Sequence, residues 1–202
     1  LAVTEPGGGS DVANLRTTAK RDGDHYIVNG SKTFITSGMR ADWLTTAVRT
    51  GGEGAGGVSV LAIPGDLPGI TRSKLDKMGW WCSDTALLHF DDVRVPASLR
   101  CGSEGMGFLG LMHNFNNERL MLAGMAVSFA RVCLADAVAW AQGRETFGRP
   151  LIKRQVIRHK LVEMQTRIAA ADALLHQTAR RVDAGEEPVA DVCMVKTLST
   201  DL

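Results

Sequence analysis

One carboxylate in the chain, Glu118, is a strong candidate for proton chemistry. It lies in the sequence NNERL, inside a run from Phe108 to Ala130 that carries no other charged residue than Glu118 and Arg119. A charged pair in such surroundings is costly unless it is neutralised by a partner or used by the protein. Two interpretations remain open. Glu118 forms a salt bridge with Arg119 or with another helix, or it is a desolvated general base whose pKa is raised toward the working pH.

A glycine-rich segment, Leu1–Asp11 (LAVTEPGGGSD), is a candidate binding loop. Its three consecutive glycines can adopt positive φ and expose bare N–H groups to an anionic ligand, with the Ser10 hydroxyl as a further donor. The alternative is a surface turn in which Ser10 or Asp11 caps a short helix that runs through Leu15. Taken alone, the segment favours the turn.

Other common catalytic and binding signatures are missing. Ser10 lacks the second glycine of G-x-S-x-G, and no dinucleotide-binding or phosphate-loop glycine motif is present. The five histidines and four scattered cysteines form no metal-ligand pattern, so we expect no metal and a reducing compartment. The net charge of +1 does not favour nucleic acid or membranes. Residues 144–181, with nine basic and three acidic residues, predict either a solvated helix face or a phosphate-bearing ligand.

In the first half of the chain, short β-rich runs are separated by turn residues, which is typical of antiparallel β structure. The segment His25–Thr36 has two β-rich runs around Asn29-Gly30, a strong hairpin signal. Further strands are expected at 43–49, 58–63, 70–75 and 85–95. About six short strands predict a small antiparallel β sandwich or barrel, which we assign to residues 1–101.

The second half, residues 102–202, has helical periodicity. The apolar stretch Gly105–Gln142 predicts a helix buried on most of its surface. Apolar residues from Ile157 to Val182 recur at alternating spacings of four and three, which predicts a helix of a bundle, and a third helix begins near Val189. The fold class is therefore α+β, a β domain followed by an incomplete four-helix bundle.

The ends of the chain and the length of its apolar runs lead to two more predictions. The chain starts without methionine inside a predicted strand and stops inside a predicted helix, so we expect a fragment of a longer, three-domain chain. No apolar run is expected to approach the ~20 residues that span a bilayer, and no signal peptide is visible.

The chain resembles acyl-CoA dehydrogenases over its whole length, specifically their middle β domain and the first part of their C-terminal helical domain. Four motifs carry the resemblance in the family's order: VTEPGGGSD at 3–11, NGSKTFIT at 29–36, FDDVRVP at 90–96 and RETFG at 144–148. The resemblance implies an FAD-dependent oxidoreductase of fatty acid and lipid metabolism.

The resemblance also implies which residues bind FAD. Residues along the flavin and its pyrophosphate would be Val3, Thr4, Gly9 and Ser10, with Phe34 and Thr36 against the isoalloxazine ring. Phe34 departs from the tryptophan of many members, which keeps an aromatic face but loses an indole donor. Arg144, Phe147 and Gln155 match positions that reach the ADP half of a neighbouring subunit's FAD, which would explain part of the basic excess.

The chemistry that the resemblance implies is α,β-dehydrogenation of an acyl-CoA thioester. A glutamate removes the α proton while the β hydrogen leaves as hydride to flavin N5. Many members carry this base late in the bundle, whereas isovaleryl- and long-chain-type enzymes carry it where Glu118 falls, so Glu118 is assigned as the base. Ser10, Asn116 and Arg119 would contact the acyl-CoA.

The expected partners follow from the same resemblance. They are an acyl-CoA substrate, an electron-transfer flavoprotein and further copies of the chain in a homotetramer or homodimer, in the cytoplasm or, in a eukaryote, the mitochondrial matrix. Two alternatives on the same fold stay open: an acyl-CoA oxidase or flavin monooxygenase, and a non-catalytic flavin-binding or DNA-protective relative.

Overall fold

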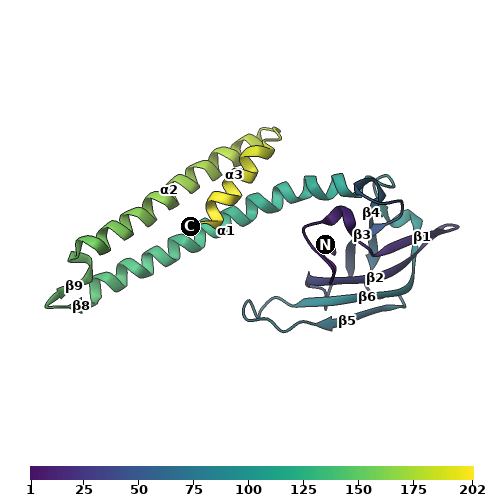
Figure 1. Cartoon of the computed structure of the whole chain (residues 1–202), viewed down its shortest axis with the longest axis horizontal. Helices are drawn as coiled ribbons and strands as arrows, with labels where there is room; N and C mark the ends of the chain where they lie inside the picture. Colours follow the sequence, from purple (N-terminus) through teal and green to yellow (C-terminus); the bar gives the residue numbers. More distant parts are fainter. The chain divides into compact units, whose positions relative to one another are not determined.

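The computed structural model describes residues 1–202, which form two compact units, Leu1–Met112 and His113–Leu202 (Figure 1). The long helix α1, Gly107–Gly143, begins in the first unit and continues in the second. The predicted fold class, a β domain followed by an incomplete helical bundle, is confirmed. The predicted boundary between residues 101 and 102 stays a prediction.

The first unit is built on one seven-stranded sheet. Its strands are β1 (Thr18–Asp22), β2 (His25–Thr36), β3 (Trp43–Arg49), β4 (Val58–Pro64), β5 (Ile70–Lys74), β6 (Thr85–Pro96) and β7 (Arg100–Cys101). They are arranged in the order β5-β6-β2-β1-β3-β4-β7. Neighbours are antiparallel except β1 and β3, which pair in parallel at Thr18 and Arg49. Single 3-10 turns occur at Val12–Asn14, Ala55–Gly57 and Ala97–Leu99.

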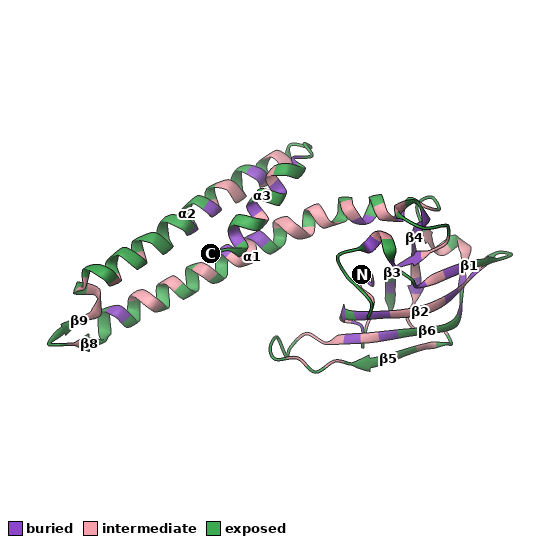
Figure 2. Ribbon diagram, in the orientation of Figure 1, coloured by how far each residue is buried: buried purple, intermediate pink, exposed green.

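The sheet curves around a shared core. Phe90 on β6 and Ile63 on β4 lie far apart in the strand order, yet both belong to one buried apolar cluster with Tyr26 and Val28 of β2. Buried residues alternate with partly or fully exposed ones along β6 except at Asp91 and Asp92, which are both exposed, as expected for a strand with one face on a core (Figure 2). A second buried cluster joins Val12 and neighbouring residues to the start of α1.

The hairpin predicted at Asn29-Gly30 is wrong. The residues His25–Thr36 form one continuous strand, and the turn lies earlier, at Gly23 between β1 and β2. Gly30 is needed for another reason: it has φ +144°, and a Cβ there would lie 2.7 Å from Thr17 Cα. The Asn-Gly pair thus marks a shift in the register of β2 with β6, at the point where the Thr17 backbone lies close to β2.

The second unit contains the rest of α1, then α2 (Gln155–Asp183) and α3 (Val189–Thr200). A short hairpin of β8 (Glu145–Thr146) and β9 (Arg149–Pro150), followed by a 3-10 turn at Leu151–Lys153, joins α1 to α2. The predicted stripe on α2 is buried at its centre, where Ile168 and Ala171 pack against Val127 of α1. Arg131 of α1 also pairs with Asp172 of α2 at 2.7 Å.

Helix α1 is less buried than its sequence predicts. Met121 and Trp140 have 63% and 68% of their surface exposed, and the buried apolar cluster of α1 in this unit is the one around Val127, which joins it to α2 (Figure 2). The expectation that no apolar run would be long enough for a membrane was also wrong: α1 is 37 residues long and includes an 18-residue window with a mean hydropathy of 1.6. Length and composition do not separate a membrane span from the core helix of a bundle.

Candidate functional site

The glycine-rich segment is tied to the sheet by its first residues. The Ala2 N–H donates to Thr45 O at 2.7 Å, and the Thr33 N–H of β2 donates to Thr4 O at 2.8 Å. Gly9 lies next to Thr4, since a Cβ at Gly9 would be 3.2 Å from Thr4 Cγ2. The structure therefore places Thr4 and Gly9, both predicted cofactor residues, beside β2.

The capped helix, the alternative interpretation of this loop, is not formed. The only helical turn is the three-residue Val12–Asn14, and no side chain caps its N-terminus. Gly7 and Gly8 have nothing within 4 Å of a built Cβ. No backbone carbonyl accepts a hydrogen bond from the N–H of Gly7, Gly9 or Ser10. Bare donors of this kind fit an anionic group such as a phosphate.

Strand β2 is strained where it passes this loop. Its pairing with β6 shifts register between Lys32 and Ile35, and Phe34 at the shift has φ +59°. Such a conformation is rare for a bulky residue and concentrates at functional sites. The Phe34 side chain is 70% exposed, Thr36 is exposed, and Ile35 between them is buried. The irregularity thus presents an aromatic face and a hydroxyl on the same side of the strand.

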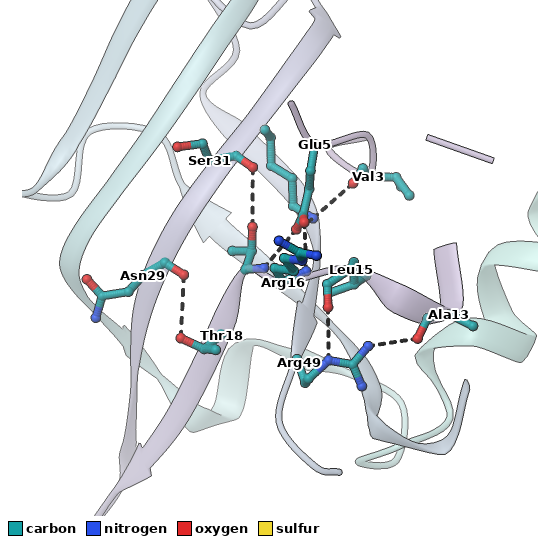
Figure 3. A network of polar contacts seen from close by, with 11 residues as sticks. Val3, Glu5, Ala13, Leu15, Arg16, Thr18, Asn29, Ser31 and Arg49 are labelled. Carbon is teal, nitrogen blue, oxygen red and sulfur yellow. Dashed lines mark hydrogen bonds and ion pairs between the residues drawn. The ribbon is translucent and has the colours of Figure 1, made fainter. Parts of the chain in front are cut away.

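Beneath the loop lies an ion pair that the sequence reasoning missed. The Lys32 ammonium donates to Val3 O and to Glu5 Oε1, both at 2.9 Å, and Glu5 also accepts from the N–H groups of Arg16 and Thr17 (Figure 3). Burial lowers the pKa of Lys32, which Glu5 only partly opposes. Burial alone would raise the pKa of the Glu5 carboxyl, but hydrogen bonds from Thr17, Lys32 and Arg16 outweigh it and hold that pKa below its usual value. A lysine within a half-polar strand carries no sequence signal that it points inward.

Glu118 lies on α1 in the second unit and is half-buried. Asn114, one turn earlier, donates to Glu118 Oε1 at 2.8 Å. Arg119 does not pair with Glu118 but donates to Asn116 Oδ1 at 2.9 Å, so the salt bridge considered from sequence is not formed. Asn116 also lines a cavity of about 200 Å³ between α1 and the turn before α3, together with His113 and other residues.

The predicted residues Arg144, Phe147 and Gln155 lie on and beside the hairpin of the second unit, and all three are exposed. Phe147 at the tip has φ +50° and 95% of its surface exposed. The Arg154 guanidinium makes two contacts with the hairpin. Its Nη2 donates to Thr146 O at 2.5 Å, and its Cζ lies 5.4 Å from the Phe147 ring centroid. The hairpin therefore projects an aromatic ring among basic side chains.

The predicted site residues fall into two groups. The loop residues and Phe34 belong to the first unit, whereas Glu118 and the hairpin residues belong to the second. Within the first group, backbone hydrogen bonds bring Thr4 against the strand that carries Phe34 and Thr36.

Comparison with known protein families matches nearly the whole chain. Residues 1–93 match the family model of the acyl-CoA dehydrogenase middle domain, and residues 105–202 match that of the acyl-CoA dehydrogenase C-terminal domain.

Individual relatives agree with the family models. The chain is 44% identical to an acyl-CoA dehydrogenase of Alternaria alternata over 175 residues, covering 87% of this chain and 40% of that protein. It is 38% identical to the mitochondrial long-chain specific acyl-CoA dehydrogenase of Mus musculus over 200 residues, covering 94% of this chain and 46% of the relative. A crystal structure of a probable acyl-CoA dehydrogenase from Mycobacterium abscessus superposes with a TM-score of 0.93 at 57% identity, covering 98% of this chain and 53% of that one. The chain spans about half the length of these relatives.

Proposed function

The chain belongs to the acyl-CoA dehydrogenase family, and we propose that its protein removes hydrogens from the α and β carbons of an acyl-CoA thioester with FAD as oxidant. The observation that carries the proposal is the open glycine loop with its free N–H groups, which follows Thr4, and Thr4 is hydrogen-bonded to β2 next to the strained, exposed Phe34. A nucleotide cofactor needs both features, because its pyrophosphate requires donors and its ring requires a flat apolar face.

Two sets of residues would hold FAD. The first comprises residues of the β domain: Val3, Thr4, Gly9, Ser10, Phe34 and Thr36. The second comprises Arg144, Phe147 and Gln155, which would contact the FAD of another copy in a homotetramer or homodimer. Their exposure supports this role, since a ring as exposed as that of Phe147 is available to a partner. When bound, FAD supplies the acceptor for the β hydrogen.

Glu118 is the proposed base for the α proton. Its Oε1 is held by Asn114 Nδ2, which fixes the carboxylate while its second oxygen makes no hydrogen bond within the chain. A positioned carboxylate with one free oxygen can accept a proton from carbon. Asn116 and Arg119, bonded to each other on the same helix, are proposed to contact the acyl-CoA, and Ser10 to contact it from the β domain.

The remaining assignments follow from family membership. We propose that reduced FAD passes its electrons to an electron-transfer flavoprotein and that α1 belongs to a helical bundle, not to a membrane. A cytoplasmic location, or the mitochondrial matrix in a eukaryote, fits the mitochondrial relatives. We also propose a domain boundary at residues 101 and 102.

The experiment is anaerobic flavin bleaching of the holoenzyme by a panel of acyl-CoA thioesters. Glu118→Gln should keep acyl-CoA binding and lose bleaching, whereas the control Glu163→Gln, an exposed carboxylate on α2, should bleach like the parent. Bleaching by Glu118→Gln at the parent rate would place the base elsewhere. A colourless parent that cannot be reconstituted would refute the FAD proposal, and rapid reoxidation by oxygen with peroxide release would identify an oxidase instead.

A further inference from the structure

Lys32 is a buried cation with no assigned role in the proposed chemistry. Its side chain has 0% exposure, and its ammonium contacts the segment Leu1–Leu15 through Val3 O and Glu5 Oε1. The next residue of β2, Thr33, donates its N–H to Thr4 O. Three consecutive residues of the segment are therefore held by two consecutive residues of one strand.

Glu5 carries this restraint to the other end of the glycine loop. Its Oε2 accepts from Arg16 N at 2.6 Å, and its Oε1 accepts from Thr17 N at 2.8 Å (Figure 3). The residues between, 6–15, include all three glycines, and their ends are joined by this one carboxylate. Because glycines restrict the backbone little, the conformation of the loop depends on how its two ends are held.

We propose that Lys32 is a positioning residue for the glycine loop, residues 6–15. By neutralising Glu5 and binding Val3 O, it keeps the N–H groups of Gly7, Gly9 and Ser10 directed at an anionic ligand. The inference deepens the proposed function and rests on it for the identity of the ligand, the pyrophosphate of FAD. It assigns to Lys32 no contact with FAD or with the substrate.

The charge of Lys32 matters more than its volume. A carboxylate that is nearly removed from water needs compensating charge, and Lys32 is the only cationic side chain bonded to Glu5. Without it, the two backbone donors of Arg16 and Thr17 must satisfy the carboxylate alone. The loop would then open to let water reach Glu5, and the donors would lose their common direction.

The test compares Lys32→Met with Tyr26→Phe. Lys32→Met keeps an unbranched side chain and removes the charge. Tyr26→Phe removes a buried hydroxyl of the same compact unit, which donates to Glu104 at 2.9 Å and makes no hydrogen bond with the loop. FAD affinity is measured by flavin fluorescence, and amide hydrogen exchange is measured on the apo-protein. If the competent loop falls to roughly a tenth of the population, the apparent Kd for FAD rises about tenfold.

The expected result is weaker FAD binding and faster exchange confined to residues 6–17 in Lys32→Met. Tyr26→Phe should lower thermal stability while its loop exchange stays at the parent rate. Lys32→Met that binds FAD within twofold of the parent, or that exchanges faster throughout the sheet, would overturn the inference. Should Lys32→Met not fold, Lys32→Met/Glu5→Gln removes both charges; because it also removes the ion pair and the donor to Val3 O, faster exchange confined to residues 6–17 is still expected, and exchange at the parent rate there would overturn the inference. A parent that binds no FAD refutes the proposed function alone, because exchange in the apo-protein reports on Lys32 independently.

Discussion

Replacing Gly30 by alanine should destabilise the β domain far more than a substitution in an ordinary turn. An added Cβ would lie 2.7 Å from both Cα and Oγ1 of Thr17 and 2.9 Å from Thr17 Cβ. The Cα is backbone that cannot rotate away, so β1 or β2 must move. Gly30 also has φ +144°, a conformation that L side chains rarely adopt.

The two contributions can be added. Overpacking in a well-packed region costs about 1–3 kcal/mol. Holding alanine in an unfavourable backbone conformation costs about 1–2 kcal/mol more. The sum is about 2–5 kcal/mol, which corresponds to a fall in Tm of roughly 4–20 °C for a domain or protein of about 150–250 residues.

Gly23→Ala is the matched control. Gly23 has φ +58° in the turn between β1 and β2, but nothing lies within 4 Å of its built Cβ. It therefore has a backbone penalty of about 1–2 kcal/mol and no overpacking. Tm measured by differential scanning calorimetry on the holoenzyme compares the two variants. Equal decreases in Tm would refute the close approach of Thr17 to Gly30.

Three further predictions concern other parts of the chain. Arg154→Met should release the hairpin and speed proteolytic cleavage near Phe147, while Arg149→Met in the same hairpin should not. Equal cleavage rates in the two variants would show that the Arg154 contacts with Thr146 O and Phe147 do not hold the hairpin. Because the pKa of Glu5 in the folded protein is lowered from 4.5, its ionisation contributes stability that is fully present above that pH and is lost as the pH falls through the folded pKa. In Glu5→Gln, the free energy of unfolding measured by urea titration should therefore fall less steeply as the pH is lowered. The same pH dependence in the variant and the parent would contradict this prediction. Ser199→Ala removes a buried hydroxyl without a partner and should change stability by no more than about 1 kcal/mol, in the stabilising direction, as measured by thermal denaturation; a clear loss would show that Ser199 has a partner in the protein.

The elements that depend on local pattern were predictable from the sequence. The strand Trp43–Arg49 has the bounds expected from its run of β formers, and the stripe on α2 indicated its buried face at Ile168 and Ala171. Both patterns arise because a strand or helix buries one face, which leaves a period in the sequence. Asn29-Gly30 shows the limit of this reasoning: the same dipeptide occurs in a tight turn and at a close approach of two backbones, and here Thr17, thirteen residues before Gly30, decides which.

The candidate site depended more on distant residues than on pattern. Lys32 sits in a strand among polar neighbours, and its burial follows from Glu5, which is 27 positions away in sequence. Phe34 was placed at the flavin by resemblance, but its positive φ comes from the register shift between β2 and β6. Non-local pairing of this kind leaves no period for a sequence pattern to reveal.

The hydrogen bonds around Glu118 favour its interpretation as a base over its interpretation as the partner of a salt bridge. A glutamate beside an arginine in an apolar run suggested an ion pair, yet the arginine bonds Asn116 instead. Asn114, one helical turn before Glu118, donates a neutral hydrogen bond to the carboxylate. This hydrogen bond orients the carboxylate and leaves its second oxygen without a hydrogen bond within the chain. Asn114→Ala should therefore impair proton abstraction by Glu118 through misorientation, lowering the anaerobic bleaching rate while leaving acyl-CoA binding intact. An unchanged bleaching rate in Asn114→Ala would remove the orienting role and leave Glu118 positioned by the substrate alone.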